Sequence, residues 1–258
     1  MNLSKITIIA LLIVVAIAVS MIVYYFYLKP TPVKKVLRVG TSPDFPPFEF
    51  INETTNEIVG IDIDLVKLIA KKIGYEVEIV PIDFDGLIPA LQAGQIDLIA
   101  SGMTITEERA KVVDFSIPYW EANQAIIVVR GGQFKPRGLE DLVGKTVGVQ
   151  TGTTAEILIT DYINKTNANI QVKSYSSYIL ATQDLLNGRL DAVIVDEPVA
   201  QALQRKYNVE ISASIETGEK YGLAIKKGNA ELLNAVNKAL NEILNSQEWY
   251  DIISKYTG

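Results

Sequence analysis

A short sequence pattern occurs twice in this chain and constrains its fold more than any other feature. Residues 91–97 read LQAGQID and precede the apolar run LIAS, and residues 185–191 read LLNGRLD and precede the apolar run AVIV. Each copy has an apolar helix end, a glycine that stops the helix, an apolar residue and an aspartate before a buried strand. Any helix–strand junction can contain such a glycine, but here the order of elements matches over about 60 residues. The repeat therefore predicts two similar α/β lobes.

Alternating strands and helices predict how each lobe is built. In the first lobe we expect strands at 36–41, 75–80 and 96–100, a helix at 65–73 that Gly74 ends, and a helix capped by Asp85 and ended by Gly94. In the second lobe we expect strands at 145–150, 170–173 and 190–195, a helix opened by Thr153 and a helix ended by Gly188. This order is typical of a mainly parallel sheet flanked by helices.

The expected ligand site lies beyond the carboxyl ends of the parallel strands. Four loops follow such ends, at 41–45, 101–104, 150–154 and 196–198. Two lobes that face each other would line a cleft with these loops. The loop at 150–154 joins a strand to a helix, and its N–H groups suit an anion. It matches neither GxxxxGK[ST] nor GxGxxG, which argues against a nucleotide.

The composition excludes several classes of function. The chain has no cysteine and no histidine, which removes disulfides, thiolate and imidazole metal sites, and catalysis by Cys or His. Its formal charge is -6, from 24 Lys+Arg and 30 Asp+Glu. Residues 1–35 contain four lysines and no acid, so the rest has 24 − 4 = 20 basic and 30 acidic residues. A domain this acidic does not suit nucleic acids, so we expect no nucleic acid partner. We also expect no metal and no other cofactor.

The N-terminal segment predicts a membrane helix. Residues 6–28 carry no charge, and a helix of that length spans about 35 Å, against about 30 Å for the hydrocarbon core of a bilayer. Tyr24, Tyr25 and Tyr27 near its end suit the membrane interface. The run is longer than the apolar part of a usual signal peptide, so an uncleaved anchor is favoured and a cleaved signal is the alternative. Residues 29–35 contain two prolines and predict a short, stiff tether.

Two charged residues near the expected cleft suit the two ends of a zwitterion. Arg109 lies early in a helix that Thr106 caps, and a guanidinium is a good bidentate partner of a carboxylate. The alternative is a surface arginine paired with Glu108 or Asp114. Asp196 follows four apolar residues, so its carboxylate needs a partner such as an ammonium group. The alternative is that it caps the next helix.

Aromatic and hydroxyl side chains complete the candidate site. Phe45 and Phe84 directly follow acidic turn residues, which suits flat walls of a cleft. The groups suited to a carboxylate belong to Arg109, Ser101, Thr104 and Thr154. Together with Asp196 for an ammonium group, these residues predict a site for an α-amino acid.

Seven segments also carry a family resemblance. They are TSPDFPPFEF (41–50), GIDIDLVKLIAKKIG (60–74), DFDGLIPALQAGQIDLIASGMTITEER (83–109), VDFSIPYW (113–120), GVQTGTT (148–154), LDAVIVDEP (190–198) and YGLAIKKGN (221–229). In this order they resemble the extracytoplasmic solute-binding proteins of polar amino acid ABC transporters, solute-binding protein family 3. The GIDIDL and SGMTITEER segments are the most specific.

The resemblance implies a two-lobed, periplasmic-binding-protein-like fold of type II, in which two α/β lobes joined by two hinge strands close on the ligand. The chain would cross near 120–124 and return near 220–223, and helices at about 230–256 would pack on the first lobe. The implied parts are residues 36–121 with 222–258 for the first lobe and 122–221 for the second lobe, after the membrane segment at 1–28.

The resemblance also implies roles for site residues. Those that bind the α-carboxylate would be Arg109, Ser101, Gly102, Thr104 and Thr154. Asp196 would bind the α-amino group, and Phe45 and Phe84 would stack on the side chain. Two residues after Gly40, where many members carry an acid, this chain has Ser42, which leaves open whether the ligand is basic. The alternative polar contacts are Asp44, Glu121 and Gln150.

The implied function is capture of a polar or basic L-amino acid on the extracytoplasmic side of the cell membrane. Partners would be the permease subunits of an ABC transporter with their ATPase, and the membrane through the N-terminal helix. We expect no enzyme, since no general base has a matched partner. One alternative is an enzyme on the same fold, similar to the cyclohexadienyl and arogenate dehydratases, with Glu197 as general acid. Another is a ligand-sensing ectodomain.

Overall fold

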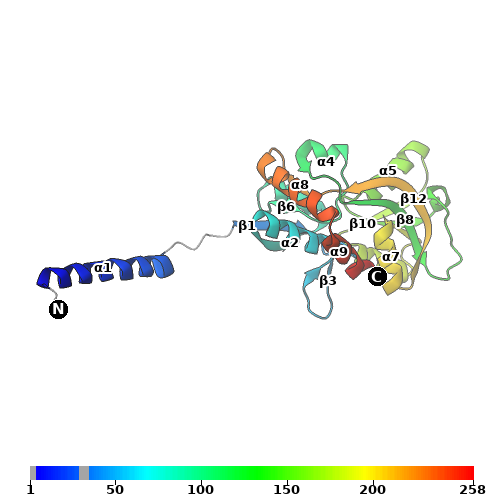
Figure 1. The fold of residues 1–258 in the computed structure, drawn as a ribbon. Coiled ribbons are helices and arrows are strands. Elements are labelled where there is room, and N and C mark those ends of the chain that lie inside the picture. The colour runs from blue at the N-terminus through cyan, green and yellow to red at the C-terminus, as the bar shows by residue number, and fades with distance from the viewer. Residues whose placement is uncertain (1–3, 29–34) are drawn as a thin grey trace. The chain divides into compact units, whose positions relative to one another are not determined.

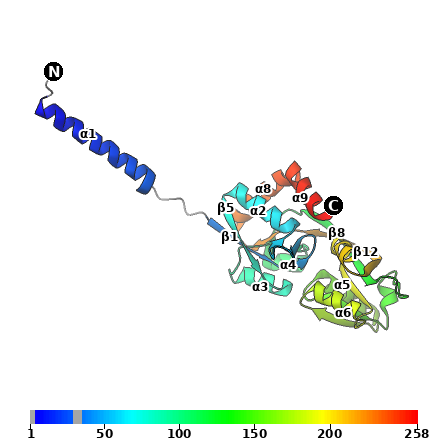
Figure 2. The same ribbon diagram turned by 90° about the horizontal axis from the view of Figure 1, so that it is seen from below.

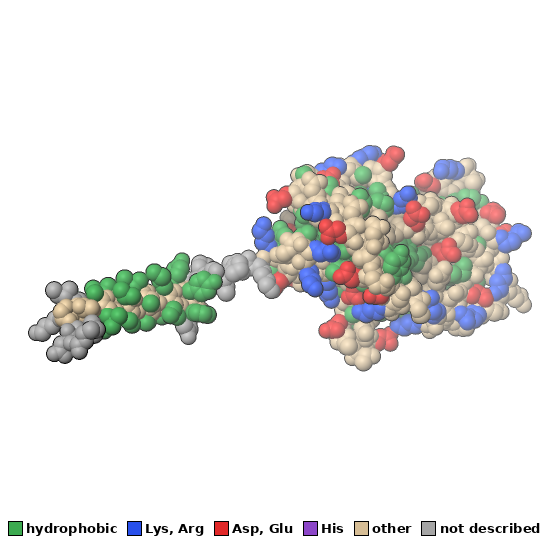
Figure 3. Space-filling model, viewed as in Figure 1, with side chains coloured by type: hydrophobic (Ala, Val, Ile, Leu, Met, Phe, Trp, Pro, Cys, Tyr) green, Lys and Arg blue, Asp and Glu red, His purple; other side chains and the backbone are tan. Residues whose placement is uncertain are grey.

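The computed structural model describes residues 4–28 and 35–258. The chain divides into an N-terminal unit, residues 1–34, and a larger unit, Lys35–Gly258. In the N-terminal unit, α1 (Lys5–Val23) continues into a π-helical turn, Tyr24–Leu28 (Figure 1). Side chains of this helix are mostly hydrophobic on the face seen in Figure 3, and charges of both signs cover the larger unit there.

The predicted apolar helix is confirmed. Residues Thr7–Phe26 have a mean hydropathy of 2.9 and, in the described part of the chain, make up the one helix long and apolar enough to cross a bilayer. The predicted tether at 29–35 lies outside the described residues except for Lys35, which begins the first strand.

The larger unit contains a first five-stranded sheet, in the order β5–β1–β6–β13–β7. Its strands are β1 (Lys35–Thr41), β5 (Tyr75–Pro81), β6 (Leu98–Ile99), β7 (Val113–Phe115) and β13 (Ala224–Lys226). Strand β1 is parallel to both neighbours, whereas β13 is antiparallel to both of its neighbours.

The second sheet repeats this plan, in the order β10–β9–β11–β8–β12. Its strands are β8 (Trp120–Val129), β9 (Thr146–Gln150), β10 (Gln171–Tyr175), β11 (Ala192–Asp196) and β12 (Val209–Tyr221). Strand β9 is parallel to both neighbours, and β8 is antiparallel to both of its neighbours. In each sheet only the fourth strand is reversed, so the predicted mainly parallel, two-lobed α/β fold is confirmed.

Asp97 and Asp191, the aspartates of the repeated pattern, make equivalent hydrogen bonds in the two lobes. Asp97 accepts a hydrogen bond from the backbone N–H of Arg38 at 3.0 Å, and its own N–H donates to the Arg38 carbonyl at 2.8 Å. Asp191 makes the same two contacts with Thr146, both at 2.8 Å. Each aspartate thus connects the start of the strand that follows the repeat to the strand beside it in the sheet, β1 in the first sheet and β9 in the second.

Helices flank both sheets (Figures 1 and 2). They are α2 (Ile61–Ile73), α3 (Leu87–Gln92), α4 (Glu107–Val112), α5 (Thr154–Thr166), α6 (Tyr178–Leu186), α7 (Glu197–Lys206), α8 (Ala230–Leu244) and α9 (Gln247–Thr257). Short 3₁₀ turns occupy Phe84–Gly86 and Leu139–Leu142. A small third sheet comprises β2 (Asp44–Phe45), β3 (Glu49–Ile51) and β4 (Ile58–Val59).

The helix boundaries test the predicted caps. Gly74 ends α2 with a left-handed φ of 81°, and the Thr153 side chain caps α5, both as predicted. The predicted cap Asp85 is wrong. It lies inside the 3₁₀ turn Phe84–Gly86, two residues before α3 begins at Leu87, and the N-cap position of α3 is occupied by Gly86.

Strands β8 and β12 connect the two lobes. Their register pairs Trp120 with Tyr221 and Ala122 with Glu219. In Figure 2, β8 runs between the part that holds α2 and α3 and the part that holds α5 and α6. The predicted lobe boundaries, 36–121 with 222–258 and 122–221, remain a prediction.

The C-terminal helices pack on the first lobe, as predicted. The hydroxyl of Tyr256 in α9 donates to Asp64 in α2 at 2.8 Å, and Lys72 in α2 pairs with Glu242 in α8 at 3.2 Å. The backbone N–H of Ile117 donates to the Asn237 side chain of α8 at 2.9 Å.

Candidate amino acid-binding site

Arg109 is buried and is not a surface residue. It is 9% exposed. Its Nη1 donates to the Thr104 carbonyl at 2.7 Å, and its Nη2 donates to the Gly152 carbonyl at 3.0 Å. The guanidinium carbon lies 5.3 Å from the centre of the Phe84 ring. The hydrogen bonds hold the guanidinium in place and leave some of its N–H groups for a ligand anion.

The alternative surface pairings of Arg109 are wrong. Glu108 pairs instead with Lys111, and Asp114 pairs with Lys227 at 2.9 Å. Thr106 does cap α4, as predicted, through a hydrogen bond from the Arg109 N–H at 3.2 Å. Burial lowers the pKa of Arg109, and the charges of Asp196 and Glu219 oppose that shift.

Asp196 ends β11 and is 3% exposed. It occupies the N-cap position of α7, as the alternative expected, but its side chain makes no capping hydrogen bond. Instead Gln124 Nε2 donates to its Oδ1 at 2.8 Å, and the Tyr221 hydroxyl donates to its Oδ2. Burial raises the pKa of Asp196 to about 7, and the charge of Glu219 adds to the shift.

Glu219, on β12, is a site residue that the sequence reasoning missed. Its Oε2 accepts the hydroxyl protons of Thr104 at 2.6 Å and Thr154 at 2.7 Å. Its Oε1 accepts Gln124 Nε2 at 3.0 Å. One carboxylate therefore joins the loop after β6 to the start of α5. Strand alternation could have found it, because Glu219 is two residues before the buried Tyr221 and faces the same side of β12.

The Ser101–Gly102 turn contacts the loop that contains Ser42 on one side and two buried acids on the other. The Ser101 hydroxyl donates to Glu49 Oε1 at 2.9 Å and accepts the Ser42 N–H at 2.9 Å. The Gly102 N–H donates to Asp62 Oδ2 at 2.9 Å. These donors serve protein carboxylates, so they are not free for a ligand carboxylate as the family resemblance implied.

Gly102 has a φ of 48°, and a Cβ there would lie 2.5 Å from a ring carbon of Phe45. The position therefore needs glycine for both backbone and space. Phe45 is buried, with ring centres 5.8 Å from Tyr178 and 6.3 Å from Tyr221. Phe84 is only partly buried and lies against Arg109.

Asp44 stands beside Ser42. The Ser42 hydroxyl donates to Asp44 Oδ1 at 2.9 Å. Asp44 Oδ2 accepts the Tyr178 N–H at 2.8 Å and Gln150 Nε2 at 3.1 Å, both from the second lobe. Burial raises the pKa of Asp44. An acid therefore does occupy this corner of the site, although the sequence places it two residues later than in many family members.

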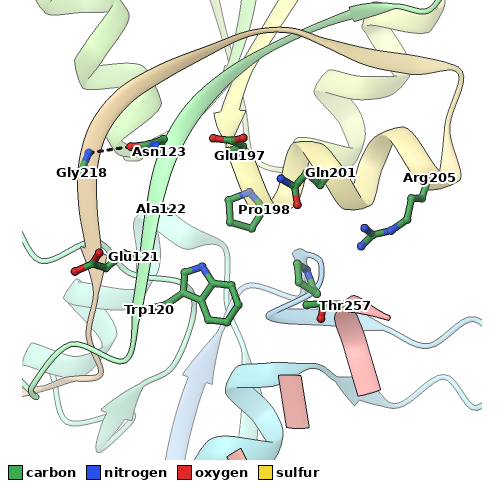
Figure 4. Close-up of a pocket in the computed structure, with 11 residues that line it drawn as sticks. Trp120, Glu121, Ala122, Asn123, Glu197, Pro198, Gln201, Arg205, Gly218 and Thr257 are labelled. Atoms are coloured by element: carbon green, nitrogen blue, oxygen red, sulfur yellow. Dashed lines mark hydrogen bonds between the residues drawn. The ribbon is translucent and has the colours of Figure 1, made fainter. Parts of the chain in front are cut away.

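Two residues predicted near the cleft lie elsewhere. Glu121 is highly exposed and pairs with Lys220 at 3.4 Å, and its role as a ligand contact remains a prediction. Glu197 accepts a hydrogen bond from the Ser214 hydroxyl at 2.7 Å. Both line a cavity of about 360 Å³ beside the strands β8 and β12, together with Trp120 (Figure 4). Neither Arg109 nor Asp196 lines this cavity.

The chain matches the family "Bacterial extracellular solute-binding proteins, family 3" over residues 37–258. Such a match covers most of the chain, and the protein belongs to this family. The predicted resemblance is confirmed.

Individual relatives have names that describe amino acid binding. The arginine-binding extracellular protein ArtP of Bacillus subtilis is 38% identical over 234 residues, which cover 87% of this chain and 88% of ArtP. An ancestral arginine-binding protein bound to arginine is 48% identical, with a TM-score of 0.82, and the match covers 87% of this chain and 99% of that chain. A structure described as an ancestral arginine-binding protein bound to glutamine is 47% identical, with a TM-score of 0.81, over 88% of this chain and 99% of that chain.

An enzyme precursor also occurs among the similar structures. It is the ancestral amino acid-binding protein AncCDT-1, described as a precursor of cyclohexadienyl dehydratase. It is 39% identical, with a TM-score of 0.79, and the match covers 86% of this chain and 96% of that chain. That protein too is described as amino acid-binding.

Proposed function

We propose that this protein captures a basic L-amino acid, arginine foremost, for an ABC transporter. The observation that carries the proposal is the charge of the site. Arg109 interacts with the charges of Asp196 and Glu219, and a third carboxylate, Asp44, accepts a hydrogen bond from Gln150. In the described part of the chain none of these three carboxylates forms an ion pair with a lysine or arginine. A ligand with one extra positive charge offsets this excess better than a neutral amino acid does.

Each end of such a ligand has a matched group. Its α-carboxylate meets Arg109 and the N–H of Thr154, which has no acceptor within α5 because it lies in the first turn. Its α-ammonium meets Asp196. Its side chain passes the rings of Phe45 and Phe84, and its cationic end reaches Asp44.

The relatives support the same ligand class. ArtP and one ancestral structure are described with arginine, and the acid Asp44 beside Ser42 removes the reason to doubt a basic ligand. The other ancestral structure, bound to glutamine, makes a neutral polar amino acid the second candidate.

The role is binding and not catalysis. The closely related proteins named above are described as binding proteins. Glu197, the candidate general acid of the enzyme alternative, lines the cavity beside β8 and β12, and neither Arg109 nor Asp196 lines that cavity.

The N-terminal helix supports a place at the membrane. The family is extracellular, and Thr7–Phe26 is apolar enough to span a bilayer. We infer that this helix anchors the larger unit on the outer side of the cell membrane. There the larger unit would deliver its ligand to permease subunits with their ATPase.

A specificity variant tests the proposal. Isothermal titration of the full chain in detergent would compare L-arginine, L-lysine, L-histidine and L-glutamine. Asp44→Asn should weaken arginine binding by about tenfold, because a hydrogen bond to a charged group is stronger than one to a neutral group. Glutamine binding should change far less, and Asp251→Asn, at an exposed position of α9, should leave both unchanged. If Asp44→Asn weakened arginine and glutamine binding equally, or if the wild type bound no basic amino acid, a basic amino acid would be excluded as the ligand.

A further inference from the structure

Two carboxyl groups lie completely buried behind the Ser101–Gly102 turn. Glu49 in β3 and Asp62 in α2 are both 0% exposed. Glu49 Oε1 accepts the Ser101 hydroxyl, and Asp62 Oδ2 accepts both the Gly102 N–H at 2.9 Å and the Tyr119 hydroxyl at 2.7 Å. The two acids therefore hold consecutive residues of a loop that lines the candidate site.

The second oxygen of each acid has no partner in the structure. Glu49 Oε2 and Asp62 Oδ1 are both buried and make no hydrogen bond. No lysine or arginine in the described residues pairs with either acid. Two buried, ionised carboxylates without a cation would be strongly destabilising. A proton on one of them removes a charge and supplies a donor for the other.

We propose that Glu49 is a neutral carboxylic acid whose Oε2–H donates to Asp62 Oδ1, and that this pair positions the Ser101–Gly102 turn. The hydrogen bond uses one orphan oxygen as donor and the other as acceptor. One proton and one negative charge are then shared between the two acids, because the charge of Asp62 disfavours ionisation of Glu49.

The surroundings decide which acid keeps the proton. Burial raises the pKa of Glu49 well above its ordinary value, and the charges of Asp62, Asp44 and Asp196 raise it further. Burial raises the pKa of Asp62 only to about 7, because the Gly102 N–H and the Tyr119 hydroxyl stabilise its charged form. Glu49 therefore carries the proton, and Asp62 carries the charge.

The pair fixes the polarity of Ser101. With its proton held by Glu49, the Ser101 oxygen can only accept, and so it suits the ligand ammonium and not the carboxylate. This last consequence rests on the proposed amino acid ligand, whereas the shared proton does not.

Glu49→Gln tests the shared proton. The amide keeps a carbonyl for Ser101 and an N–H donor for Asp62, so the variant should fold and bind L-arginine within about threefold of the wild type. The wild-type Tm should fall as the pH rises above the ordinary pKa of glutamate, because the folded chain there retains a proton that the unfolded chain has lost. The variant has no carboxyl group at this position, so its Tm should not fall for this reason. The difference between the Tm of the variant and that of the wild type should therefore grow as the pH rises. The matched control Glu57→Gln, exposed next to β4, should follow the wild type.

The results separate the possible explanations. Glu49→Leu, which removes donor and acceptor, should lower the Tm and weaken binding at every pH. If Glu49→Gln lowers the Tm by the same amount at every pH, Glu49 acts as an ionised carboxylate and the proposal is wrong. Absence of arginine binding would refute the proposed function, while the pH dependence of melting would still test the shared proton.

A measurement on the wild type covers the case in which the variants do not fold. At about pH 8.5, above the pKa of about 7 of Asp62 and Asp196, the full chain should retain an infrared band of a protonated carboxyl group. Isotope labelling of glutamate should shift that band. Its absence at this pH would overturn the proposal.

Discussion

Acidification should weaken ligand binding through Asp196. Its carboxylate must be ionised to hold the ligand ammonium, and its pKa without ligand is raised to about 7. At that pKa the ionised fraction is about 0.9 at pH 8, about 0.1 at pH 6 and about 0.01 at pH 5. Because only the ionised form is competent, the apparent Kd for L-arginine should rise about tenfold from pH 8 to 6 and about 90-fold from pH 8 to 5.

Calorimetry provides the assay. Since the ligand stabilises the ionised form, binding near neutral pH should release about half a proton per ligand at pH 7 and about 0.9 at pH 6. Titrations in buffers of different ionisation enthalpy measure this number directly. Asp196→Asn should weaken binding and remove most of the pH dependence. A Kd that is constant from pH 8 to 6, without proton release, would refute the reasoning.

Two further substitutions test the geometry of the site. Glu219→Gln should weaken arginine binding by about tenfold and move the pH midpoint of binding downward, because the charge of Glu219 helps to raise the pKa of Asp196. Glu216→Gln, at an exposed position of the same strand, should have neither effect. An unchanged midpoint in Glu219→Gln would contradict the coupling between Glu219 and Asp196. Gly102→Ala should destabilise the fold by about 1–3 kcal/mol through strain and a clash with the adjacent ring, measurable as a lower Tm. Gly228→Ala, also at positive φ but with open space around it, should cost less, and equal losses would argue against the clash.

The sequence predicted the fold because its signals are local. Alternating apolar runs and glycine stops identify strands and helices without tertiary information, and the repeat at Asp97 and Asp191 identifies two equivalent lobes. The error at Asp85 is a boundary error. A 3₁₀ turn and an α-helix start with similar residues, and only the three-dimensional path distinguishes them.

The charged ends of the site were predictable, but their surroundings were not. Arg109 stands out as a guanidinium early in a capped helix, and Asp196 stands out as a carboxylate that follows four apolar residues. Whether Arg109 meets solvent or the cleft depends on contacts with Gly152, which is 43 residues away in sequence. Such a choice between local and long-range partners cannot be made from spacing alone.

The contacts of Glu219 and Gln124 were missed for a related reason. Glu219 and Gln124 belong to strands whose alternation shows which face each side chain takes, but not what stands opposite that face. Glu49 and Asp62 belong to family-like segments, yet their burial and their unpaired oxygens become evident only when both acids are seen behind the same turn. Direction of hydrogen bonds, as at Ser101, likewise requires the structure.

The most direct test of a site with two charged ends compares L-arginine with analogues that lack one end. Isothermal titration of the full chain in detergent at about pH 8 would use L-arginine, agmatine without the carboxylate, and 5-guanidinopentanoate without the α-amine. Arginine should bind, and each analogue should bind at least about tenfold more weakly, because Arg109 or Asp196 is then left unpaired. No binding of arginine, or equal affinity for all three compounds, would contradict a site built on these two residues.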